Sequence, residues 1–415
     1  MNKTTGKKIL KGIGFWIAAI VAFTFFLVAV FSIPRAWLQE HVDRSLEMIQ
    51  EEGEYPTPFF HIFACKMDNV ADEILIRIAE QPDQNEAMAS LVVGDHSKDV
   101  YSEDWDATAL EKAMVGGYAR YWHGYEVVLR PLLMVTDLAG VRYFNMMVFF
   151  LLLFTCLLQI REKLGVKTAV AFLVSVLMVY GFAVPMCMEF VSVFWILFGA
   201  VSVLLAYYDR WREHPERVAY FFVLIGSLTN FMDFLTAPIL TLGIPLLFYC
   251  VLEARRGTGF RRMMVRSILF SAIWGISYAM TWISKWAFAS LLLQKNVMAD
   301  ALQSMLFRTG GGESEAIPRG LMLMNNIGKL FGSDANSMIF KVCVLMAAAM
   351  GVYFLLRHKP WKKIAKNGVF LWIALYPILW YLVLSNHSYI HPYFTYRALI
   401  VSLMGAWCFW AEGIW

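Results

Sequence analysis

Long stretches without a single charged side chain constrain this sequence more than any other feature. No Asp, Glu, Lys or Arg occurs in residues 12–34, 143–160, 168–188, 190–208, 234–252, 267–284 and 367–396. A helix needs about 20 predominantly apolar residues to cross the hydrocarbon core of a bilayer, so each stretch is long enough. Shorter apolar runs at 218–232, 342–356 and 398–411 can also cross if their flanking charges lie at an interface. We therefore expect about ten spans.

Composition supports the same class of protein. The chain has 415 residues, of which 59% are hydrophobic and only 16% charged, whereas soluble domains carry about 25% charged residues. A water-soluble domain of this length would lack the polar side chains for its surface. The apolar core from Ile13 to Ile33 is also longer than the roughly 7–15 residues of a signal peptide, so we expect an anchor there. The predicted fold class is an all-α polytopic integral membrane protein.

The short basic segments predict the orientation. They are "MNKTTGKKILK", "REKLGVK", "DRWREHPER", "EARRGTGFRRMMVR" and "RHKPWKKIAK", and they follow every second span. The positive-inside rule assigns them, with the N-terminus, to the cytoplasm. The opposite, extracytoplasmic side then receives 36–123, 291–335 and 385–396. The first of these has 18 acidic residues against 6 Lys and Arg.

The chain is thus expected to have five parts. They are residues 1–35 (N-terminus and first span), 36–123 (outer loop with surface helices), 124–290 (spans), 291–335 (outer loop) and 336–415 (last spans, with the outer loop 385–397). Helical spacing in "RAWLQEHVDRSLEMIQEEGEY" and "ADEILIRIAE" predicts two amphipathic helices in the first outer loop. Pro131 and Gly140 interrupt the next apolar run, which favours a partial or re-entrant helix near 124–140. Non-helical backbone at that depth must be covered by protein or line a wet cavity.

Three carboxylates stand together in "MDNVADEIL", just after the first span. Asp68 and Asp72 are four residues apart, so they would share one face of a helix that begins near Asp68. Repulsion between like charges raises one pKa and favours a general base or a bound divalent cation. The alternative is an acidic helix start that is stabilised by the helix dipole.

Two aromatic and basic segments are candidate phosphate or ligand sites. "RYWHGY" and the residues after it supply Arg120, Tyr121, His123 and Arg130, and arginines near a membrane surface can bind phosphate bidentately. The other reading is an interfacial aromatic belt. "SNHSYIHPYFTYR" supplies His387, His391, Tyr396 and Arg397 within one short outer loop. These groups indicate a polar ligand, although a lone arginine at an interface can also simply extend to water.

Two further charged residues have equally balanced interpretations. Asp233 in "TNFMDFLTAP" can cap a turn, pair with a nearby arginine or support catalysis. Lys285 in "TWISKWAF" can extend to the interface or contact a phosphate.

Other classes of function have little support. There is no P-loop, GxSxG, HExxH or dinucleotide fingerprint. The net charge of +4 is accounted for by the cytoplasmic loops, so no nucleic-acid partner is indicated. The six cysteines have no ligand-like spacing, and they predict neither a thiol metal site nor a disulfide framework.

The order of these features resembles the GT-C superfamily of polytopic glycosyltransferases, which use polyprenyl-phosphate-linked sugars. The likeness rests on "DNVAD" in a large first outer loop, on "RYWHGY" and on the many spans. It implies that Asp68, or secondly Asp72, activates the acceptor, with Asp233 in support. It also implies that Arg120, His123, Arg130 or Arg397 holds the lipid phosphate. No cofactor is indicated beyond a divalent cation.

The expected protein is a plasma-membrane glycosyltransferase with an extracytoplasmic active site. It would move a hexosyl or pentosyl group, with inversion, to a glycan, lipid or protein acceptor of the cell envelope. A polysaccharide polymerase or ligase shares these features. A transporter or flippase of a lipid-linked or anionic substrate predicts broken-helix repeats and charges at the bilayer midplane, and we find no repeat.

Overall fold

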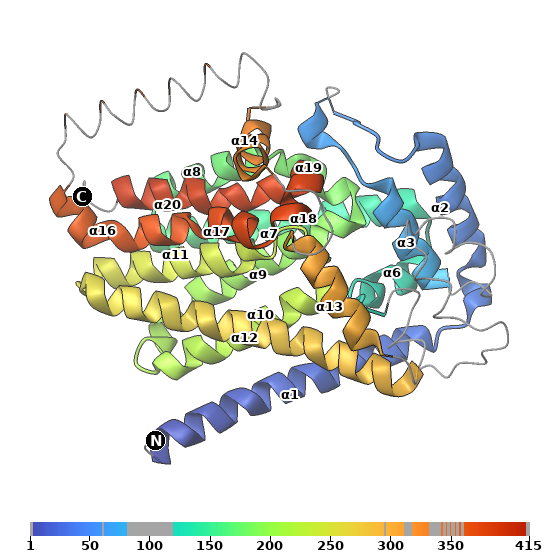
Figure 1. Ribbon diagram of the computed structural model, residues 1–415, viewed down its shortest axis with the longest axis horizontal. Helices are drawn as coiled ribbons and strands as arrows, with labels where there is room; N and C mark the ends of the chain where they lie inside the picture. The colour runs from blue at the N-terminus through green and yellow to red at the C-terminus, as the bar shows by residue number, and fades with distance from the viewer. Residues whose placement is uncertain are drawn as a thin grey trace.

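The computed structural model describes residues 3–59, 62–80, 119–293, 296–310, 318–331 and 361–411, with isolated positions between 342 and 357. Most of these residues are helical, and no strand occurs among them (Figure 1). The longer helices are α1 (Lys3–Phe31), α7 (Leu138–Leu164), α8 (Val166–Met178), α9 (Met188–Trp211), α10 (Pro215–Met232), α11 (Ile239–Arg255), α12 (Phe260–Leu293), α16 (Trp361–Ala374) and α20 (Ile400–Ala411). The other α-helices are α2 (Gln39–Glu52), α3 (Asn69–Glu80), α6 (Glu126–Leu133), α13 (Val297–Arg308), α14 (Arg319–Lys329), α17 (Tyr376–Val383), α18 (Ser385–Ile390) and α19 (Pro392–Thr395).

Six helical segments in the described part of the chain are long and apolar enough to cross a membrane. They are Thr5–Phe31, Leu138–Leu164, Met188–Trp211, Phe260–Leu292, Lys366–Val383 and Pro392–Ala411. The α-helical membrane class is therefore supported, while the total of ten spans stays a prediction. The predicted span at 342–356 lies outside the fully described residues.

The bundle has two distinct ends (Figure 1). One end carries the N-terminus together with the basic connections between α7 and α8, α9 and α10, and α11 and α12, which ion pairs such as Lys163–Asp209 and Arg256–Asp209 tie together. We call it the N-terminal end. The other end carries α2, α3 and α6, and we call it the α3 end. Four of the five basic segments that the charge pattern assigned to one side of the membrane thus gather at one end, and the fifth, at 357–366, lies only partly within the described residues.

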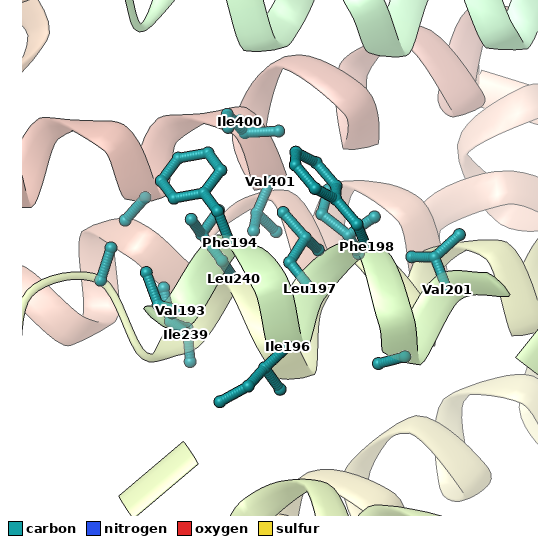
Figure 2. Close-up of a cluster of buried hydrophobic side chains, with 14 of the residues drawn as sticks. Val193, Phe194, Ile196, Leu197, Phe198, Val201, Ile239, Leu240, Ile400 and Val401 are labelled. Atoms are coloured by element: carbon teal, nitrogen blue, oxygen red, sulfur yellow. The ribbon is translucent and has the colours of Figure 1, made fainter. Parts of the chain in front are cut away.

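The centre of the bundle is formed by α9, α11 and α20. Figure 2 shows Phe194, Leu197 and Phe198 of α9 beside Leu240 of α11 and Val401 of α20. In α9, 67% of the most apolar window is buried, compared with 22% in α1 and 28% in α7. The outer helices expose large apolar side chains, as expected for surfaces that face lipid.

Two predicted spans are not single continuous helices. The stretch 168–188 is helical only to Met178 and continues as a 3-10 helix, Gly181–Met186. Tyr180 has φ of 52°, a left-handed conformation that no continuing α-helix adopts, and Pro185 lacks an amide hydrogen. The stretch 367–396 is divided among α16, α17, α18 and α19.

The short helices near the α3 end agree with the sequence. Both amphipathic helices of the first loop form, as α2 and α3, and the interrupted run after residue 124 forms the eight-residue helix α6. Arg130 of α6 is buried and donates hydrogen bonds to the backbone carbonyls of Val30 (2.8 Å), Ile33 (2.7 Å) and Ala79. This guanidinium joins the end of α1 to the end of α3.

Gly226 allows α10 and α12 to approach closely. A Cβ built at Gly226 would lie 2.5 Å from the carbonyl oxygen of Trp274 and 2.3 Å from Oγ of Ser277, both on α12. Small residues at helix crossings are the usual means of close packing in membranes.

We predict that Gly226→Ala lowers the stability of the protein by about 1–3 kcal/mol, because the added methyl group forces the two helices apart. Gly275→Ala on α12 is the matched control, since no atom lies within 4 Å of its new Cβ. The midpoint of thermal unfolding in detergent, followed by tryptophan fluorescence, measures both. Equal midpoints for the two variants would contradict the packing argument.

Candidate functional site

Asp68 stands directly before α3, at the α3 end of the bundle. Its Oδ1 accepts a hydrogen bond from the amide of Ala71 at 3.0 Å, so it caps the helix as the simpler reading of the sequence predicts. Its Oδ2 accepts a second hydrogen bond, at 2.6 Å, from the hydroxyl of Tyr393. The side chain is buried, and burial raises the pKa of the carboxyl above its ordinary value despite these two bonds. A carboxylate with a raised pKa is a stronger base than a solvent-exposed one.

The segment 385–397 supplies the groups around Asp68. His391 lies 3.4 Å from the Tyr393 hydroxyl through Nδ1, and its ring is 5.0 Å from that of His387. Nε2 of His387 lies 2.9 Å from the carbonyl oxygen of Leu235, so this nitrogen carries the proton. The polar loop near the end of the chain and the acid of the first loop, 325 residues apart, thus share one hydrogen-bonded cluster.

Both histidines are held neutral. Burial, followed by the charge of Arg308, lowers the pKa of His391 to about 4 and the pKa of His387 well below its ordinary value. At neutral pH they can donate or accept hydrogen bonds but add no positive charge.

Lys66 brings a cation to the same cluster. Its ammonium lies over the rings of Tyr55 at 3.7 Å and Tyr393 at 4.5 Å. Cation–π contacts of this kind hold the ammonium beside the aromatic wall, and its charge acts on Asp68.

Arg397, in the 3-10 helix Tyr396–Leu399 directly before α20, and Glu189, in the first turn of α9, complete the cluster. Arg397 is 2% exposed, and its guanidinium lies 4.4 Å from the ring centroid of Phe190 and 5.5 Å from that of Tyr396, with no hydrogen bond to any of its three nitrogens. Glu189 begins α9, is buried, and has one carboxylate oxygen without a partner. Its electrostatic interactions include both Asp68 and Arg397. A buried guanidinium without hydrogen bonds is costly, which suits a group that binds an anion.

Asp72 has a different task from Asp68. It is fully buried, and its Oδ1 accepts hydrogen bonds from the amides of Met188 (2.9 Å) and Glu189 (3.3 Å) and from the thiol of Cys187. It therefore caps the N-terminus of α9 from a neighbouring helix. Burial raises the pKa of Asp72 to about 7. The geometry favours a supporting role for Asp72 and leaves Asp68 as the candidate base.

Asp233 caps its own turn, as one reading of the sequence predicts. Its Oδ1 accepts bonds from the amide of Thr236 at 3.2 Å and from the Thr236 hydroxyl, while Oδ2 is buried without a partner.

The "RYWHGY" segment forms a second group beside α12 and α13. Arg120 pairs with Asp300 at 3.2 Å and bonds to Ser304. Tyr121 stacks with Arg308 at 5.6 Å. His123 is buried with φ of 54°, and its ring lies 5.5 Å from that of Phe234. This second group lies next to the cluster around Asp68. Arg308 belongs to the second group and His387 to the cluster, and the charge of Arg308 acts on His387.

Three other predicted site residues have structural contacts. Lys285 is fully buried in α12, with its ammonium 5.7 Å from the ring of Trp122. The Tyr396 hydroxyl lies within hydrogen-bond distance of the carbonyls of Ala64 and Val179. Arg130 is occupied by the carbonyls described above. Contact of these three with a ligand stays a prediction.

The sequence interpretation passed over Lys66 and Glu189, whereas Tyr393 belongs to the loop 385–397 that it singled out as a ligand site. Lys66 directly precedes "MDNVADEIL", and Glu189 is the single charge between two apolar stretches. The position of Glu189 within an otherwise apolar stretch could have indicated a functional residue, because ionisable residues in membrane spans are often functional. Within the described residues no group of three His, Cys, Asp or Glu side chains is arranged to hold a metal ion, and a divalent cation stays a prediction.

Comparisons with protein-family models, with curated proteins and with solved structures found no match to this chain.

Asp72 yields a pH-dependent prediction. Its pKa is raised from 3.8 to about 7 in the folded protein, so its contribution to stability is present at low pH and is lost as the pH rises through about 7. Asp72→Asn keeps an oxygen for the α9 amides and cannot ionise. The folded state binds more protons than the unfolded chain between pH 3.8 and about 7, so we expect the variant to match the wild type in unfolding midpoint near pH 4 and to exceed it by a margin that grows up to about pH 7.

The control for this measurement is Asp43→Asn, which changes an exposed carboxyl on α2 and should show no such trend. An Asp72→Asn midpoint below that of the wild type at every pH would mean that the ionised carboxylate stabilises α9.

Proposed function

We propose that this protein is a membrane glycosyltransferase, which transfers a hexosyl or pentosyl group from a polyprenyl-phosphate donor to a hydroxyl of a cell-envelope acceptor. The reaction would occur at the α3 end, facing away from the cytoplasm, in the plasma membrane. The single observation that carries this proposal is that Asp68, hydrogen-bonded to Tyr393, shares one buried cluster with the unpartnered guanidinium of Arg397.

Each group has a role in an inverting displacement. The Asp68 carboxylate takes the proton of the acceptor hydroxyl as its oxygen attacks the anomeric carbon. The bond from that carbon to the phosphate oxygen breaks, and the lipid phosphate leaves with the electron pair. Arg397, with Lys66, stabilises the negative charge that develops on the phosphate. Tyr393 orients Asp68.

The distribution of unpartnered polar atoms supports this assignment of ends. At the α3 end, one oxygen each of Asp72, Glu189 and Asp233 lacks a partner, as do the nitrogens of Arg397. At the N-terminal end, the buried Glu253 binds Tyr208 at 2.7 Å and Arg266 at 2.5 Å. Buried charged groups are normally paired or hydrogen-bonded, so the unpartnered charged atoms at the α3 end support a ligand site there.

The first test measures sugar transfer by purified protein with radiolabelled polyprenyl-phosphate sugars. Asp68→Asn should lower the rate by a factor of at least about 100, because general base catalysis typically contributes 10²–10⁴-fold. The matched control, Asp43→Asn, removes an exposed acid of the same loop and should keep the wild-type rate. Transfer that persists in Asp68→Asn would exclude Asp68 as the base, and donor binding without turnover would favour a transporter.

Arg397 supplies a second test, which separates ligand binding from structural support. A methionine at this position removes a buried guanidinium that makes no hydrogen bond, so Arg397→Met should leave the unfolding midpoint at or above that of the wild type. The same variant should bind the polyprenyl-phosphate donor more weakly. A fall in both stability and binding would instead indicate that Arg397 is a structural residue.

A further inference from the structure

A large pocket lies at the N-terminal end, far along the bundle from the proposed active site. It has a volume of about 810 Å³ and is formed by α1, α9 and α10, whose ends meet near the N-terminus (Figure 1). This volume is within the range of pockets that hold small organic ligands, about 300–1,000 Å³. Nothing in the proposed transfer reaction uses it.

The lining of the pocket is strongly cationic. It includes Lys7, Lys8, Lys11 and Arg217, against one acid, Glu216. Lys8 already pairs with Glu216 at 3.3 Å, and His214 lies 3.4 Å from the same carboxylate. Lys7, Lys11 and Arg217 form no ion pair with another described residue. Their three positive charges are therefore not neutralised by an acid of the pocket. Because α10 starts at Pro215, the positive end of its dipole adds to them.

The remaining lining is apolar and aromatic, and it extends away from the cations. The Lys11 ammonium lies 5.7 Å from the ring of Tyr220 and 6.0 Å from that of Phe15. Leu224 also lines the pocket and is 41% exposed. It is nine residues beyond Pro215, which is roughly 13 Å along the helix. One pocket therefore joins a cationic mouth to an apolar wall.

We propose that this pocket binds an anionic phospholipid, with the phosphate against Lys7, Lys11 and Arg217 and an acyl chain along Phe15 and Leu224. Basic pockets between membrane helices on the cytoplasmic side are suited to anionic head groups. A soluble phosphate would use the cations but leave the apolar wall empty, so the lining favours a lipid. The lipid would bridge α1, which is mostly lipid-exposed, to α10.

The experiment is native mass spectrometry of the purified full chain with phosphatidylglycerol or phosphatidylcholine added. The wild type should retain phosphatidylglycerol in preference to phosphatidylcholine. Lys7→Gln with Lys11→Gln should weaken that retention at least about tenfold, since each basic residue near an anionic lipid contributes about 1 kcal/mol. This pair leaves the Lys8–Glu216 ion pair intact.

The matched control is Arg261→Gln with Arg262→Gln, which removes two exposed charges at the start of α12, at the same end but outside the pocket. It should retain the lipid as the wild type does. An equal loss in both double variants would overturn the proposal, because general surface charge would then explain the binding. Displacement of the lipid by an equal concentration of glycerol phosphate would also overturn it, because the apolar wall would then contribute nothing.

Discussion

The α3 end of this protein depends on one contact, in which the Asp72 carboxylate of α3 caps the N-terminus of α9. Because α9 is one of the central helices of the bundle, this contact attaches the first loop to the core rather than to the surface. It also orients α3 so that Asp68 lies against Tyr393. Arg142 strengthens the arrangement by donating to Glu52 of α2 at 2.6 Å and to Asn69 at 3.2 Å. The two acids, one helical turn apart, thus hold different partners, because Asp72 binds the start of α9 and Asp68 binds Tyr393.

That division explains how far the sequence could predict the site. The spacing of Asp68 and Asp72 correctly indicated a helix with two acids near its start, since i and i+4 positions are a local property. The spacing could not reveal that one carboxylate binds the amides of α9 while the other binds Tyr393. Both contacts join residues more than 100 positions apart, and no local pattern encodes them. Likewise, the apolar stretches predicted most helices, but the left-handed turn at Tyr180 came from packing rather than from composition.

Arg130 and Arg397 show why residue type alone was insufficient. Both are buried arginines that follow aromatic segments, and both were reasonable phosphate ligands. Arg130 donates to three carbonyls, whereas the three nitrogens of Arg397 have no hydrogen-bond partner. The difference is that backbone carbonyls at the ends of α1 and α3 lie within hydrogen-bond distance of Arg130. It decides which of the two can offer its donors to a ligand.

The two ends of the bundle differ in whether their charged side chains are paired. At the N-terminal end, acids such as Asp209 and Glu253 are paired, and the excess cations line a wide pocket. At the α3 end, carboxylates and a guanidinium are buried with incomplete hydrogen bonding. Burial of a charged group without hydrogen-bond partners lowers the stability of the fold. Proteins keep such destabilising groups where they bind a ligand or take part in a reaction. By this argument, substitutions that stabilise the α3 end should be the ones that impair its chemistry, whereas those at the N-terminal end should alter the response to lipid.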